Sequence, residues 1–133
     1  DWQPIEILFV ASGKSPARLR SAFSLRGAEI VKRFTQIELD RQNSLSVLLL
    51  VAISQDGSAF KICVQAQPNF DRQILPPNLE LNLLDASETV LASIQADARD
   101  NYIQLPYFRG VLQEEFGLSL SLDSITYQEK FVI

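Results

Sequence analysis

The chain lacks several residues on which enzyme chemistry and metal binding most often depend. It contains no histidine and one cysteine, Cys63, among its 133 residues. Without histidine there is no Ser-His-Asp or Cys-His catalysis and no imidazole metal site. A single cysteine forms neither a disulfide within the chain nor a thiolate zinc site. Five scattered glycines form no phosphate-binding loop. We therefore expect no catalytic residues, no cofactor and no metal.

Methionine and long apolar runs are also missing. The chain starts at Asp1 and has no methionine, so we expect it to be the C-terminal domain of a longer protein. The longest unbroken apolar run, Val47 to Ile53, is far too short to span a bilayer, and no signal peptide opens the chain. The lone cysteine suits a reducing compartment. These features predict a soluble, cytoplasmic protein that is not membrane-bound.

Length and composition fit one globular domain over residues 1–133. Hydrophobic residues make up 47% of the chain and charged residues 21%, which is ordinary for a folded protein. The net charge of −4 argues against nucleic acid as a partner, because nucleic-acid binders carry a basic surface.

Hydrophobic alternation dominates the pattern. Phe116, Leu118, Leu120 and Leu122 alternate with small or polar residues, which predicts a strand with a buried face and a solvated face that holds Ser119 and Ser121. Residues 60–67 and 79–83 alternate in the same way, and 45–53 is apolar at nearly every position, as in a central strand. Further strands are expected at Ile30–Leu39, Val90–Ala96, Asn101–Leu105 and Ile125–Ile133, with an extra candidate at Ile5–Val10.

The turns support the same architecture. Asp56-Gly57 lies between two apolar segments, which is a strong hairpin signal. Ser15-Pro16 predicts the start of a short helix over residues 16–26 that would pack through Leu19, Ala22 and Phe23. The spacing of the strands is typical of an all-β, mainly antiparallel fold, a two-sheet β-sandwich of about eight strands with one short helix near the N-terminus.

Carboxylates are the remaining candidates for chemistry. Asp97, Asp100, Glu114 and Glu115 lie in predicted turns and loops, where they could bind Ca²⁺ or serve a carboxylate-only hydrolase. We favour solvated turn residues and expect no two of these carboxylates, nor Glu129, to share a cleft. Glu129 interrupts an apolar stripe, and we interpret it as an inward-pointing charge that protects an edge strand, or as part of a bulge that turns it outward.

Three aromatic residues cluster at Tyr102, Tyr107 and Phe108. They could form a carbohydrate platform or a protein-binding hot spot, but core residues at the end of a sandwich would look the same. Cys63 lies beside Lys61 on the polar face of its strand, and without a partner base we expect a plain, unreactive thiol.

The distribution of charge is the strongest functional hint. Half of all lysines and arginines lie within residues 14–33, on and beside the predicted helix, and the remainder of the chain is acidic. Arg18, Arg20 and Arg26 are the candidate interaction residues, which could dock an acidic protein partner, the rest of the parent chain or a second copy. A simple solvated face is the alternative.

Several strings resemble a known family. They are Ile74–Asp85, Gln95–Leu105, Glu129–Ile133, Val31–Leu39 and the opening Asp1-Trp-Gln-Pro. They are similar to the C-terminal region of the cyanobacterial "domain of unknown function 1822" family. That family tends to have a glycine where this chain has Ala86-Ser87-Glu88, and Pro-Gly where it has Leu112-Gln113. The resemblance implies a longer parent protein and no established activity.

Function follows mainly by exclusion. We expect a non-enzymatic protein-interaction module of a larger cytoplasmic protein. A carbohydrate- or Ca²⁺-binding module would need aromatic or acidic loops gathered at one end of the sandwich. A carboxylate-only hydrolase would need two carboxylates that face each other across a cleft.

Overall fold

The computed structural model describes residues 2–4, 30–40, 45–69 and 72–133. All regular secondary structure in these segments is β-strand, which confirms the all-β prediction. The predicted helix over 16–26 and the candidate strand Ile5–Val10 lie outside the described residues.

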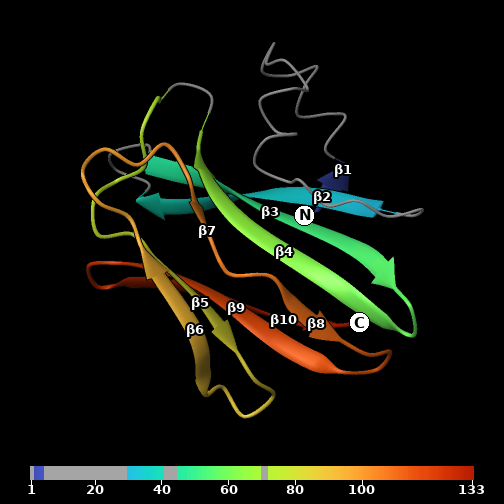
Figure 1. Cartoon of the computed structure of the whole chain (residues 1–133). Helices are drawn as coiled ribbons and strands as arrows, with labels where there is room; N and C mark the ends of the chain where they lie inside the picture. Colours follow the sequence, from blue (N-terminus) through green and yellow to red (C-terminus); the bar gives the residue numbers. More distant parts are fainter. Residues whose placement is uncertain (1, 5–29, 41–44, 70–71) are drawn as a thin grey trace.

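Two antiparallel sheets lie face to face as layers (Figure 1). The first sheet has the order β1-β2-β3-β4-β7, with β8 also paired to β4. The second sheet has the order β10-β9-β5-β6. This arrangement confirms the two-sheet sandwich. The strands are β1 (Gln3–Pro4), β2 (Ile30–Asp40), β3 (Leu45–Asp56), β4 (Ala59–Pro68), β5 (Glu80–Leu84), β6 (Val90–Gln95), β7 (Ile103–Gln104), β8 (Phe108–Gly110), β9 (Glu115–Leu122) and β10 (Ile125–Val132).

Two tight hairpins set the registers of the long strands. Asp56 pairs with Ala59 across the β3–β4 turn, and Gly57 there has a φ of 65°, a conformation that glycine adopts without steric cost. Leu122 pairs with Ile125 across the β9–β10 turn. The first hairpin agrees with the turn signal at Asp56-Gly57, whereas β1 and β8 are too short to leave an alternating pattern.

The core fills the space between the layers. Apolar residues of β3 and β4 pack against β5 and β9, including Leu49 and Leu118, which are fully buried. The opposite face of β3 is buried too, at Leu48, Leu50 and Ala52, which confirms that β3 is covered on both faces. A row of aromatic rings crosses the core: Trp2–Phe131 (5.5 Å between ring centroids), Phe131–Phe116 (5.1 Å) and Phe116–Phe108 (5.3 Å).

The prediction for β9 is correct on one face and partly wrong on the other. Phe116, Leu118, Leu120 and Leu122 are buried, as expected, but so is Ser119, which is 5% exposed. Ser119 lies opposite Asn82 of β5, and Asn82 Nδ2 donates a hydrogen bond to Ser119 Oγ (3.1 Å). Because β5 and β9 are the two central strands of their sheet, neighbouring strands shield this small side chain from both sides.

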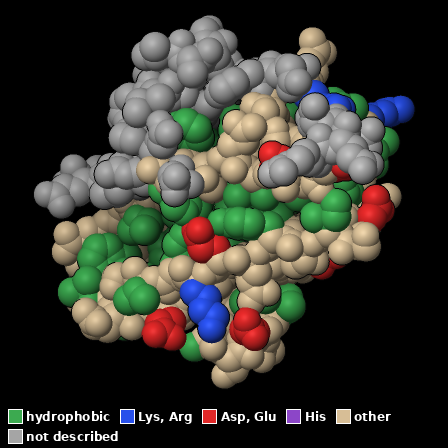
Figure 2. Space-filling model, turned by 180° about the vertical axis from the view of Figure 1, so that it is seen from behind, with side chains coloured by type: hydrophobic (Ala, Val, Ile, Leu, Met, Phe, Trp, Pro, Cys, Tyr) green, Lys and Arg blue, Asp and Glu red, His purple; other side chains and the backbone are tan. Residues whose placement is uncertain are grey.

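The surface mixes polar and apolar side chains. From behind, a band of hydrophobic side chains crosses the middle of the molecule, interrupted by acidic ones (Figure 2). The described part of the chain contains no helix that is long and apolar enough to cross a membrane.

Candidate functional site

A cavity of about 130 Å³ opens at one end of the sandwich, between β8 of the first sheet and β5, β6 and β9 of the second. Its walls are mainly apolar. The apolar lining side chains are Leu83, Leu84, Leu91, Phe108, Phe116 and Ile133.

Two local features shape the walls of this cavity. Leu84 pairs with Val90 and Leu83 pairs with Ala92, so Leu91 is an extra residue in a β-bulge, which re-aims its side chain. On the opposite wall, a Cβ on Gly110 would lie 2.3 Å from Ile133 Cδ1, closer than atoms can approach. The absence of a side chain at Gly110 therefore leaves room for Ile133.

Exposed apolar side chains occur on the lining residue Leu91 and in the loop between the lining residues Gly110 and Glu114. Leu91 is 61% exposed, and in the loop that follows Gly110, Val111 is 53% and Leu112 is 66% exposed. Water contacts most of these side chains, so covering them would release free energy. Adjacent exposed residues of this type mark interaction surfaces more often than isolated ones do.

The rim of the cavity is polar and mostly acidic. It includes Asp85, Arg109, Glu114 and Glu115. The Asp85 carboxylate accepts hydrogen bonds from the backbone N–H groups of Ser87 (2.8 Å) and Thr89 (2.9 Å). Glu114 accepts one from the N–H of Val111 (3.0 Å). These two carboxylates therefore hold their own loops in place while they keep the rim acidic.

The expectation that no two candidate carboxylates share a cleft is wrong for Glu114 and Glu115, which both line this cavity. They are adjacent in sequence: Glu114 ends the β8–β9 loop and Glu115 is the first residue of β9. Asp97 and Asp100 instead fix their own turn, with Asp100 accepting from the N–H of Asp97 (2.9 Å). Within the described residues, no three carboxylate or thiol groups converge on a point that could hold a metal ion.

Glu129 points inward from β10, the edge strand of the second sheet. Its Oε2 accepts a hydrogen bond from Trp2 Nε1 (2.6 Å), and its Oε1 accepts one from the Tyr127 hydroxyl (2.8 Å). The β9–β10 register is regular at this position, so the inward-pointing interpretation is correct and the bulge is not. Burial and the adjacent Glu129 carboxylate raise the pKa of Tyr127 above its usual range.

The three clustered aromatics do not form one platform. Phe108 packs on Phe116 in the core, whereas Tyr102 and Tyr107 are exposed. Lys61 Nζ lies 4.4 Å from the centre of the Tyr107 ring. The assignment of Cys63 to a polar face is wrong, because β4 is covered on both faces there and Cys63 is fully buried. Burial raises the pKa of its thiol to about 12, against a smaller opposing effect of Lys61. A buried, protonated thiol agrees with the unreactive cysteine that we expected.

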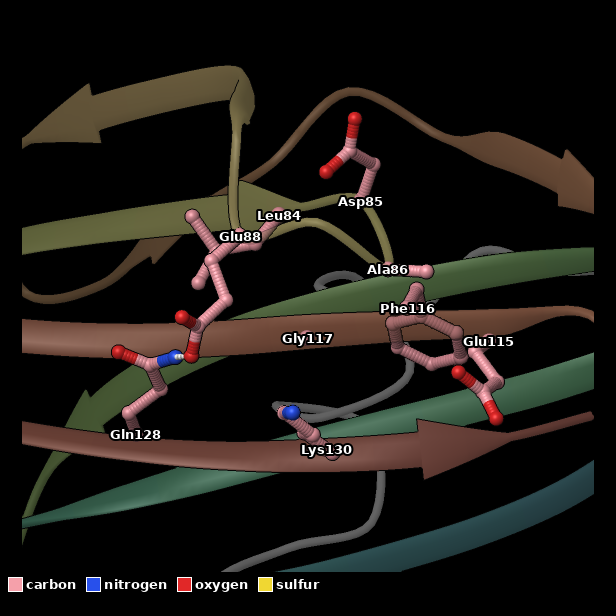
Figure 3. A pocket seen from close by; sticks show the side chains of 9 residues that line it. All are labelled: Leu84, Asp85, Ala86, Glu88, Glu115, Phe116, Gly117, Gln128 and Lys130. Atoms are coloured by element: carbon pink, nitrogen blue, oxygen red, sulfur yellow. Dashed lines mark hydrogen bonds between the residues drawn. The ribbon is translucent and has the colours of Figure 1, made fainter.

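A second, much smaller hollow adjoins the cavity (Figure 3). Its volume is about 10 Å³, room for one water molecule. It lies over Gly117, where β9 has no side chain, and Gln128 Nε2 donates a hydrogen bond to Glu88 Oε1 beside it. The hollow and the cavity share Leu84, Asp85, Glu115 and Phe116.

Arg18, Arg20 and Arg26 lie outside the described residues, so their role stays a prediction. Sequence reasoning missed the cavity, although two signals pointed to it. Val90-Leu91 and Val111-Leu112 are apolar pairs that break the alternation beside turns, and strictly alternating strands leave no such pairs exposed.

Comparison with known proteins identifies the family. A family model described as "Protein of unknown function (DUF1822)" matches residues 6–132. The chain belongs to the DUF1822 family. Neither the search of curated proteins nor that of solved structures gave a match.

In two turns this chain lacks the glycine that we expected from the DUF1822 pattern. Glu88 has a φ of 67° and Gln113 a φ of 73°. Both values lie in the left-handed region, which favours glycine. The two turns where we expected a glycine in DUF1822 therefore do adopt the backbone conformation that glycine suits.

Proposed function

We propose that this DUF1822 domain is a non-enzymatic protein-interaction module, and that an apolar side chain of the partner protein enters the cavity at the end of the sandwich. The observation that supports the proposal is the cavity itself, an apolar hollow with exposed Leu91 in its wall and exposed Val111 and Leu112 in the loop between the lining residues Gly110 and Glu114.

The size of the cavity favours a protein side chain over a free small molecule. Pockets for drug-sized ligands measure roughly 300–1,000 Å³. The cavity here measures about 130 Å³, close to the roughly 150 Å³ of a dry cavity that admits benzene. One aliphatic side chain or one aromatic ring would fill it, whereas an oligosaccharide would be too large to enter.

In this proposal, burial of the exposed apolar side chains supplies binding free energy, and the rim carboxylates orient the partner. Full burial of an exposed leucine or valine is worth roughly 1.5–3 kcal/mol, so the three exposed apolar residues would account for much of a moderate affinity. The rim carboxylates Asp85, Glu114 and Glu115 would favour a partner with lysine or arginine beside the buried side chain. We place the module in the cytoplasm as part of the same proposal, because a reducing compartment suits the lone thiol of Cys63.

Paired variants test this proposal. Leu91→Glu puts a charge on a side chain that lines the cavity, and Leu112→Glu puts one in the loop between two lining residues, Gly110 and Glu114. Ile74→Glu puts the same charge at an exposed apolar residue (47% exposed) that neither lines the cavity nor lies in this loop. The wild-type chain and each variant are immobilised, and proteins retained from a lysate of the source cells are quantified by mass spectrometry. Unchanged thermal melting confirms that each variant is folded.

We expect a defined set of proteins to be retained by the wild type and by Ile74→Glu, and lost from both cavity variants. A retained set that is the same for all four chains would overturn the proposal. A rise in melting temperature with CaCl₂ or with simple sugars, abolished by changes at Asp85 or Glu115, would instead favour the Ca²⁺- or carbohydrate-binding alternative.

A further inference from the structure

The strand next to the cavity, β6, is a sheet edge that carries no protective charge or proline of its own. β6 is the last strand of the second sheet. β7 of the first sheet lies near it, but none of the described strands pairs with its outer side. Its six residues, Val90–Gln95, include no charge and no proline. Exposed edges normally carry such residues because an unprotected edge pairs with other chains. The opposite edge, β10, has the inward-pointing Glu129.

The hydrogen bonds of β6 show which backbone groups face outward. The N–H of Ala96 donates to the carbonyl of Leu79 (2.8 Å), so that pair is a hydrogen-bonded one. Hydrogen-bonded and non-hydrogen-bonded pairs alternate along an antiparallel ladder. Counted from Leu79–Ala96, Leu81–Ile94 is the second pair and is hydrogen-bonded, whereas Asn82–Ser93 is the third pair and is not. Ile94 therefore bonds to β5, while Ser93 and Gln95 direct their N–H and C=O groups away from it.

We propose that the partner binds as an additional antiparallel strand on the outer edge of β6, which places one of its side chains in the cavity. This inference rests on the proposed function and specifies its binding mode. Leu91 connects the two features, because it belongs to β6 and also lines the cavity. In strand addition, main-chain hydrogen bonds supply affinity and pockets for alternate side chains supply specificity.

The acidic residues at both ends of β6 indicate what kind of segment would bind to it. Asp85 and Glu88 precede the strand, Asp97 and Asp100 follow it, and Arg99 is the one cation between residues 85 and 100. Antiparallel pairing of β6 with a second copy would bring Glu88 of one chain near Asp97 of the other, and like charges across a strand pair are destabilising. The partner is therefore a different segment, extended, with apolar residues at alternate positions and lysine or arginine at its ends.

The test uses a phage-displayed library of nine-residue peptides selected on the 133-residue chain. Ser93→Pro removes one outward N–H without removing a hydrogen bond to β5, and Ser93→Thr is the matched control that keeps this N–H. We expect selected peptides to alternate apolar residues between basic ends. They should bind Ser93→Pro at least 10-fold more weakly than wild type, and Ser93→Thr within about 2-fold of wild type, since the edge loses one main-chain bond and its pairing geometry.

Amide hydrogen exchange in the wild-type chain, with and without a selected peptide, tests the same binding mode even if Ser93→Pro folds poorly. The amides of Ser93 and Gln95 should exchange at least 10-fold more slowly when a selected peptide is bound. Equal peptide binding by Ser93→Pro and wild type, unprotected amides at Ser93 and Gln95, or failure to select any peptide would each overturn strand addition. Peptides that bind Ser93→Pro as tightly as the wild type but do not bind Leu91→Glu would overturn this binding mode and leave the cavity as the docking site.

Discussion

Replacing Gln113 by glycine should stabilise the domain. Gln113 lies in the β8–β9 loop with a φ of 73°, and its N–H donates a hydrogen bond to the carbonyl of Ile133 (2.8 Å). The loop must therefore hold this backbone conformation to keep the bond. For a residue with a Cβ, the left-handed region costs roughly 1–2 kcal/mol, because the Cβ crowds the following carbonyl oxygen.

The expected gain is smaller than this cost, because glycine also increases the freedom of the unfolded chain. That opposing effect amounts to roughly 0.4–1 kcal/mol. The net expectation for Gln113→Gly is a rise of about 0.5–1 kcal/mol in the free energy of unfolding. For a domain of this length, this corresponds to roughly 2–4 °C in melting temperature.

Two control variants separate backbone strain from side-chain effects. Gln113→Ala shortens the exposed side chain but keeps the Cβ, so its stability should stay near that of the wild type. Leu112→Gly places glycine at the adjacent residue, which is not among those with positive φ, and should lose about 0.5–1 kcal/mol. Urea unfolding measures all three. If Gln113→Gly is no more stable than Gln113→Ala, the argument from strain in this loop is wrong.

Three further predictions concern buried polar groups. Ser119→Ala should destabilise the fold by about 1–2 kcal/mol because it removes the acceptor of Asn82 Nδ2, while Ser121→Ala should change stability by less than about 0.5 kcal/mol in the same urea titration. Burial raises the pKa of Cys63 from 9.0 to about 12. The unfolded chain therefore loses the thiol proton first, and stability should fall above pH 9 by up to about 1.4 kcal/mol per pH unit, a loss that Cys63→Ala should lack. Glu129→Leu should cost about 1–3 kcal/mol, since two part-buried donors lose their acceptor, and should increase self-association by sedimentation; a monomer at all concentrations would show that Glu129 does not guard the β10 edge.

Sequence patterns predicted those parts of the fold that depend on neighbours along the chain. The alternation from Phe116 to Leu122 predicted β9, and Asp56-Gly57 predicted the β3–β4 hairpin, because side-chain period and turn preference are local properties. The burial of Ser119 escaped prediction because it depends on Asn82, which lies in a strand that only the tertiary fold brings alongside.

The cavity could not be predicted for the same physical reason. Its walls include the bulge at Leu91, which shows only in the pairing of β5 with β6. They also include the contact between Gly110 and Ile133, which are 23 residues apart in the sequence. The inward direction of Glu129 was one of two open interpretations, and the positions of Trp2 and Tyr127 decide it. Alternation showed which face Glu129 would occupy in a regular strand, but not that the strand would be regular there.

The order of strands along the chain has a consequence for folding during synthesis. β3 and β4 are consecutive, so their hairpin can form as soon as residue 68 is available, and hairpins form within microseconds. The inner faces of these strands, with Val47, Leu49 and Val64, are covered in the native state by a sheet whose central strand β9 ends at residue 122. At roughly 5–20 residues per second, the ribosome needs about 3–10 s to make that stretch. A nascent chain therefore presents an apolar sheet face for seconds, long enough for chaperones to bind it and for neighbouring chains to aggregate on it.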